Sequence, residues 1–177
     1  NQWRARFPIR FAAVLGLALA VMGLATGGAT FGSGSEQVQH MLSGDANTPA
    51  IFVTLKFIAT WLSAWTGAPG GIFAPSLSIG AGVGQNISVW VAPELAPALI
   101  AMGMAAFLAA VTQAPLTAFI IVMEMIDGHS MVLSLMTAAM LASLISRMLA
   151  RPLYETLAEF MVASVQPAQK PEPDPEA

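Results

Sequence analysis

The sequence has no cysteine, and its only two histidines, His40 and His129, stand apart in polar stretches. Disulfide bonds and thiolate metal sites are therefore excluded, and two isolated imidazoles do not form a ligand cluster. We expect neither a metal ion nor a cofactor.

Charge is also scarce, because only 10% of the 177 residues are charged, against roughly 25% in an average soluble domain. Hydrophobic residues make up 56% of the chain, and the mean hydropathy is +0.69. This composition indicates a membrane protein. The net charge is −3, and charged residues concentrate at the two ends of the chain. Arginines lie near the start, and acidic residues lie over 172–177. Neither cluster is basic enough to bind nucleic acid.

The chain also lacks an initiator methionine and a secretory leader, since it begins Asn1-Gln2-Trp3. A leader would need a charged start, an apolar centre and a small-residue cleavage site. We therefore expect a fragment or a processed protein.

What the sequence has in abundance is uncharged apolar segments separated by polar or glycine-rich connections. A membrane-spanning helix needs about 20 such residues, so the pattern predicts an all-α membrane protein. The expected apolar segments are 11–31, 48–65, 95–111, 116–125 and 130–146, with short helices over 36–42 and 151–161 and a disordered, proline-rich acidic tail over 163–177.

Arginine positions predict the orientation in the membrane. Arginines precede the first apolar segment, and Arg147 and Arg151 follow the last one. Positive charge favours the cytoplasmic side, so both ends of the chain are expected there, and the acidic turn "EMIDGHS" is expected outside. The protein is then a multi-pass cell-membrane protein, which we place in a bacterial inner membrane.

Two further features predict helix packing within a bundle. Lys56 is the one charge inside its apolar segment, and an intramembrane lysine faces protein or water rather than lipid. Small residues crowd "AMGMAAFLAA" and "MTAAMLASLIS", which allows close approach of helices.

The stretch "GAPGGIFAP", residues 67–75, interrupts an uncharged run from Phe57 to Pro93. A non-helical loop at membrane depth is tolerated only inside protein or beside water. The spacing predicts a helix over residues 72–80. Its start would leave the first amides without partners at the positive end of the helix dipole, where an anion binds. Gly70 and Gly71 would leave the approach clear. A plain connection between two spans is the alternative.

One helix terminus is too weak to hold an anion alone. It contributes about 0.3–2 kcal/mol, whereas removing a charge from water costs several kcal/mol. Further donors are needed, and the hydroxyl of Tyr154, the only tyrosine, is a candidate. An interfacial aromatic anchor is the other interpretation of Tyr154.

With these residues in view, "GAPGGIFAPSLSIGAGVG" and "PLYE" together resemble the CLC family of chloride channels and proton-coupled chloride antiporters. The resemblance covers about residues 11–160. It implies a bundle of tilted and broken transmembrane helices over residues 1–162, forming the second half of an inverted-repeat membrane domain. The missing N-terminal half would supply the other filter segments, and two copies would form a homodimer.

The resemblance also implies the site residues. The backbone amides of Ile72 and Phe73 would coordinate chloride within a selectivity-filter motif, and the hydroxyl of Tyr154 would contact the same ion. Chloride would be the transported ligand, carried by a channel or by a proton-coupled exchanger. The motif residues are Gly71, Ile72, Phe73, Ala74 and Pro75.

Two other functions compete with chloride transport. One is a transporter of another broken-helix family, which would bind an organic substrate. The other is an intramembrane serine hydrolase, because "FGSGSE" places Ser33 and Ser35 among glycines and a histidine is available.

Overall fold

The computed structural model describes residues 8–44, 49, 51–66 and 71–149. These residues form α-helices joined by turns and two short 3-10 helices, with no strand among them, which confirms the all-α prediction. The elements are α2 (Pro8–Ala25), α3 (Ser35–Leu42), α4 (Phe52–Thr66), α5 (Phe73–Val91), η1 (Pro93–Leu95), α6 (Ala96–Thr112), α7 (Pro115–Met125), η2 (His129–Met131) and α8 (Val132–Leu149).

Most predicted boundaries lie within a few residues of the observed ones, but the first apolar segment does not. The helix there ends at Ala25, and turns replace it up to Gly34. Gly27, Gly28, Gly32 and Gly34 have positive φ angles in this segment. Glycine adopts such angles without a steric penalty, so the glycine run ends the helix earlier than its hydropathy suggests.

Helix α5 is longer than the sequence indicated. The expected helix covered residues 72–80, whereas α5 runs from Phe73 to Val91 and has 19 residues. Glycine lowers helix propensity by about 1 kcal/mol per residue, and Gly80, Gly82 and Gly84 lie in this helix. Tertiary packing against α6 stabilises the helix despite that composition.

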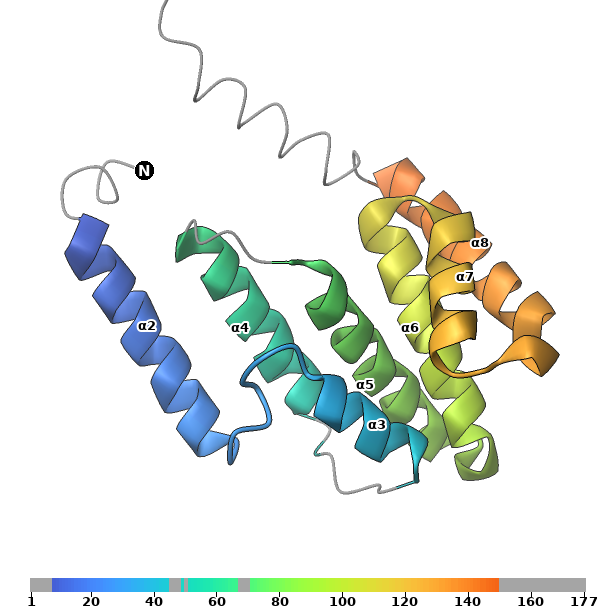
Figure 1. The fold of residues 1–177 in the computed structure, drawn as a ribbon, viewed down its shortest axis with the longest axis horizontal. Coiled ribbons are helices and arrows are strands. Elements are labelled where there is room, and N and C mark those ends of the chain that lie inside the picture. The colour runs from blue at the N-terminus through green and yellow to red at the C-terminus, as the bar shows by residue number, and fades with distance from the viewer. Residues whose placement is uncertain (1–7, 45–48, 50, 67–70, 150–177) are drawn as a thin grey trace, which may run out of the picture.

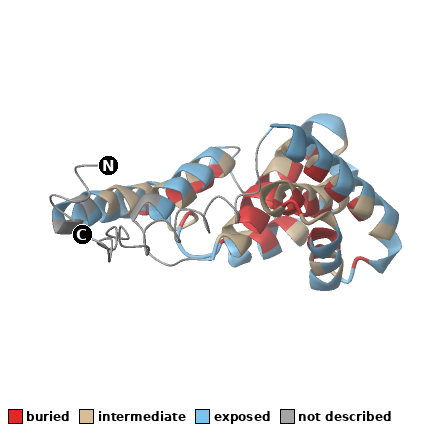
Figure 2. Cartoon of the chain, turned by 90° about the horizontal axis from the view of Figure 1, so that it is seen from above, coloured by how far each residue is buried: buried red, intermediate tan, exposed pale blue. Residues whose placement is uncertain are grey.

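Helices α5, α6, α7 and α8 form the packed part of the molecule, and α6 contacts each of the other three (Figure 1). The buried residues gather in this part, whereas α2 is mostly exposed (Figure 2). Helix α6 supplies six of the buried hydrophobic residues, namely Ile100, Ala101, Met104, Ala105, Leu108 and Ala109.

Glycines bring the backbones of α5 and α6 into direct contact. A Cβ atom added at Gly80 would lie 2.5 Å from the carbonyl oxygen of Gly103, and one at Gly84 would overlap the carbonyl of Leu99. In lipid no hydrophobic force drives helices together, so close van der Waals contact through small residues takes its place. Gly103 belongs to the predicted small-residue segment "AMGMAAFLAA", whereas Gly80 and Gly84 lie outside both predicted segments.

Large apolar side chains cover the outside of these helices. Trp90 is 89% exposed, and Leu133 and Leu149 are also largely exposed. Two continuous helical segments among the described residues, Pro93–Thr112 and His129–Leu149, are long and apolar enough to cross a membrane. Three shorter apolar helices accompany them, at Ala12–Ala25, Phe52–Ala64 and Pro115–Met125.

Lys56 is buried, with 2% of its surface exposed, as the sequence predicted for an intramembrane lysine. Its ammonium group donates hydrogen bonds to the carbonyl oxygens of Thr30 (3.1 Å) and Gly32 (2.9 Å). Gly34 packs beside it, because an added Cβ would lie 3.2 Å from Lys56 Cε and 2.7 Å from Ser78 Cβ. Lys56 therefore links the turn after α2 to α4 through hydrogen bonds, and Ser78 of α5 lies beside this link.

The helix directions agree with the expected orientation. Helix α2, which carries Arg10 near its start, begins on the side of the molecule where α8 ends with Arg147 (Figure 1). The acidic turn that contains Asp127 lies at the opposite end, between α7 and α8. Arg4, Arg6, Arg151 and the tail over 163–177 lie outside the described residues.

The glycine contact predicts opposite effects for the same substitution at two sites. Gly84→Ala should lower stability by about 1–3 kcal/mol, because the added methyl group forces α5 and α6 apart. Gly16→Ala on α2 should be neutral or stabilising, because nothing lies within 4 Å of its Cβ position and alanine favours helix. Thermal unfolding of the detergent-solubilised protein measures both, and equal melting temperatures would contradict the contact.

The Lys56 contacts predict a second difference. Lys56→Met should cost about 1–3 kcal/mol, because it leaves the Thr30 and Gly32 carbonyls without their donor. Phe57→Met, at the neighbouring exposed position, should change stability by less than about 0.5 kcal/mol. The same melting experiment compares the two variants, and an unchanged melting temperature for Lys56→Met would show that the turn does not depend on this side chain.

Candidate functional site

The candidate site is the N-terminus of α5, where the predicted motif lies. Ile72 caps the helix with φ −77° and ψ −17°, and no side chain forms a cap hydrogen bond there. The first backbone hydrogen bond of the helix runs from the Ser76 amide to the Ile72 carbonyl (3.1 Å). The amides of Ile72, Phe73 and Ala74 precede that bond, so the helix itself offers them no acceptor.

In the first two turns of α5, serine hydroxyls bond to backbone carbonyl oxygens, and Pro75 contributes no amide donor. Pro75 sits in the first turn, as predicted, and has no N–H group. The hydroxyl of Ser76 donates to the Ile72 carbonyl (2.7 Å), and that of Ser78 donates to the Pro75 carbonyl (3.0 Å). Both serines are buried. The free hydrogen-bonding capacity at this end is therefore made of backbone donors, which suits an anion.

The motif residues are partly open to their surroundings. Gly71 and Ala74 are exposed, and Ile72, Phe73 and Pro75 are half-buried. A Cβ added at Gly71 would meet nothing within 4 Å, which agrees with the expectation of a clear approach. Phe73 packs against the hydrophobic core. The helix start is thus fixed on its inner side and accessible on the other.

Two parts of the predicted site lie outside the described residues. They are the loop over 67–70, which includes Gly70, and the residues from 150 onward, which include Tyr154 and the expected short helix over 151–161. The contact between Tyr154 and an ion stays a prediction.

A second helix interruption lies at Gln113 and Ala114, between the predicted apolar segments 95–111 and 116–125. Gln113 has a φ of 55°, in the left-handed region that ends a helix. Helix α7 begins at Pro115, and its first hydrogen bonds include that from the Ala118 amide to the Ala114 carbonyl (3.0 Å). Both restarted helices, α5 and α7, begin on the side where α8 ends (Figure 1).

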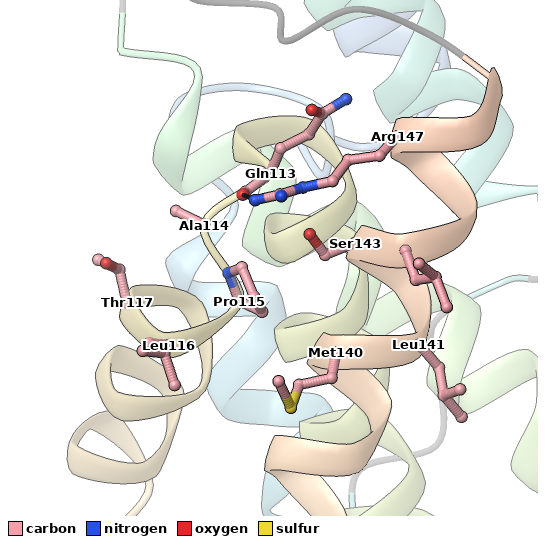
Figure 3. A pocket seen from close by; sticks show the side chains of 10 residues that line it. Gln113, Ala114, Pro115, Leu116, Thr117, Met140, Leu141, Ser143 and Arg147 are labelled. Carbon is pink, nitrogen blue, oxygen red and sulfur yellow. Dashed lines mark hydrogen bonds between the residues drawn. The ribbon is translucent and has the colours of Figure 1, made fainter.

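Side chains of α8 satisfy the carbonyls at this second break. Arg147 donates to the Gln113 carbonyl (2.9 Å), and the Ser146 hydroxyl donates to the Ala110 carbonyl (2.6 Å). Figure 3 shows the Arg147 guanidinium reaching across to Gln113. The sequence did not predict these contacts, although Ser143, Ser146 and Arg147 share one helix face by their spacing of three and four residues.

The residues proposed for a serine hydrolase do not form a nucleophile and base pair. The hydroxyl of Ser33 donates to that of Ser35 (3.1 Å), and both residues are exposed. A hydrolytic serine needs a base within hydrogen-bond reach, and this serine pairs with another serine. His40 is exposed on α3.

Comparison with known protein families gives a match over most of the chain. A family model described as "Voltage gated chloride channel" matches residues 1–147 of the chain. The matched segment includes both restarted helices and all five motif residues from Gly71 to Pro75. Tyr154 lies beyond it.

Proposed function

The chain belongs to the voltage gated chloride channel family, and from that membership we propose that it transports chloride and holds the ion at the N-terminus of α5. Members of this family are membrane-embedded channels and transporters rather than enzymes. In this proposal chloride is the transported ligand, and transport requires no cofactor.

The observation that carries the proposal is the set of backbone donors at the start of α5. The amides of Ile72 and Phe73 precede the first intrahelical hydrogen bond, and the helix dipole adds partial positive charge at the same place. Chloride accepts such hydrogen bonds without losing a proton. Because the donors are neutral, they release the ion more easily than a buried arginine would.

The free energy that one helix N-terminus supplies is too small to hold chloride, so the ion needs hydrogen-bond donors besides those of α5. A helix terminus contributes about 0.3–2 kcal/mol to a nearby anion, less than the several kcal/mol that desolvation costs. We assign a second donor to the Tyr154 hydroxyl and the remaining ones to the N-terminal half of the same domain. The whole protein is then a multi-pass protein of a bacterial inner membrane that works as a homodimer with one pathway in each subunit.

The first test removes one amide without changing the helix. Ile72→Pro deletes the proposed donor, and the observed φ of −77° is close to the proline value of about −65°. Chloride flux into liposomes that contain the full-length protein, with both halves of the domain, should fall about tenfold or more, since a hydrogen bond to a charged group contributes about 1.5–3 kcal/mol.

Ile72→Val is the matched control, because it trims the side chain and keeps the amide. It should retain nearly the full flux. If Ile72→Pro eluted as a folded protein in size-exclusion chromatography and conducted chloride like the control, the Ile72 amide would not be part of the ion site.

The second test concerns the tyrosine hydroxyl. Tyr154→Phe should weaken chloride binding roughly threefold to tenfold in isothermal titration calorimetry, because the ring stays and one donor is lost. Tyr154→Leu should weaken it no further if the hydroxyl alone matters. Unchanged binding in Tyr154→Phe would assign this residue to the membrane interface instead.

A further inference from the structure

Lys56 carries a charge that its contacts in the described part of the chain do not neutralise. It is the only buried basic residue there, and its ammonium group donates to the carbonyl oxygens of Thr30 (3.1 Å) and Gly32 (2.9 Å). Both acceptors are uncharged, and among the described residues no carboxylate lies within ion-pair distance of this ammonium. The turn therefore satisfies two donors of Lys56 and leaves its positive charge unpaired.

The turn itself does not require a charge. A neutral amide donor could also bond to the two carbonyl oxygens. Burying an ammonium group without an anionic partner is costly, because the charge loses its hydration. A charge kept at this position, where a neutral donor would serve the turn, points to a second role for Lys56.

The charge lies beside the helix that begins at the candidate ion site. A Cβ added at Gly34 would lie 3.2 Å from Lys56 Cε and 2.7 Å from Ser78 Cβ, so the two side chains pack around the same small residue. Ser78 belongs to the second turn of α5, which starts at Phe73. With a rise of about 1.5 Å per residue, the Phe73 amide is about 8 Å further along the helix. The ammonium group is then about 10–15 Å from the proposed chloride position.

Little water separates this charge from the start of α5. Residues 76–82 of the helix are all buried, and buried charges are screened much less than exposed ones. The acidic residues that the structure describes are all exposed, namely Glu36, Glu94, Glu124 and Asp127. Arg10 and Arg147 are exposed as well. Lys56 is therefore the least screened formal charge in the described part of the chain.

We propose that the charge of Lys56 raises the affinity of the α5 site for chloride without touching the ion, an inference that rests on the proposed function. Two unit charges about 12 Å apart, at an effective dielectric constant of about 20, attract each other enough to change binding about tenfold. Lys56 would thus supply part of the free energy that the helix terminus lacks. Because it makes no contact with the ion, no bond to Lys56 has to break when the ion leaves.

Isothermal titration calorimetry of the full-length protein, with both halves of the domain and sodium chloride as the titrant, tests the role of the charge. Lys56→Gln keeps a hydrogen-bond donor for the turn and removes the charge, so the Kd for chloride should rise about tenfold. Lys56→Arg keeps the charge and should stay within about twofold of the unmodified protein. Equal Kd values for Lys56→Gln and the unmodified protein would overturn this inference alone. An unmodified protein that bound no chloride would overturn the proposed function with it.

Two further variants separate the charge from its structural setting. Gly34→Ala disturbs the same junction, because Gly34 has a φ of +83° and Ser78 leaves no room for a methyl group, but it keeps the lysine. It should lower the melting temperature and retain chloride affinity within about twofold. Arg10→Gln removes an exposed positive charge and should leave the affinity unchanged, since water screens that charge. If either variant lost as much affinity as Lys56→Gln, packing or net charge would explain the effect, and the proposal would be wrong.

Discussion

A backbone amide or carbonyl without a partner costs several kcal/mol in a hydrocarbon environment, and every helix interruption in this chain must meet that requirement. The two ends of a broken helix present opposite problems. A helix that stops exposes carbonyl oxygens, and a helix that restarts exposes amides. The structure deals with the two kinds of end differently, and the difference is relevant to function.

Exposed carbonyls receive cationic or hydroxyl side chains from a neighbouring helix. Lys56 donates to two carbonyls in the turn after α2, and Arg147 and Ser146 donate to the carbonyls of Gln113 and Ala110 at the end of α6. No side chain caps α5 or α7, although the Thr112 hydroxyl accepts a hydrogen bond from the Ala114 amide just before α7 (3.3 Å). The amides of Ile72 and Phe73 at the start of α5 remain as donors, and the proposed chloride site uses them.

The sequence predicted the helices and the place of the first break well, because both depend on local composition. Hydropathy marks the segments, Pro115 marks a helix start, and a lone charge such as Lys56 must be buried against protein. The contacts of Lys56 could not be foreseen, since Gly32 lies 24 positions away along the chain. For the same reason Ser146 and Arg147 gave no sign of their partners, which lie 34 to 36 positions earlier. The full length of α5 was not predicted, because its glycines lower the helix propensity and the packing against α6 that offsets this effect cannot be read from the sequence.

Those glycines also determine how firmly the candidate ion site is held. Gly80, Gly84 and Gly103 let the α5 and α6 backbones touch, and interlocking backbones leave fewer alternative arrangements than flexible side chains do. The first amides of α5 lie only two turns from Gly80, so a shift of that contact would move them directly. A weak, neutral set of donors can select an anion only if its geometry is preorganised. For the proposed chloride site, close glycine packing of α5 against α6 would provide that rigidity without an added charge, and a site made of neutral donors would release the ion readily.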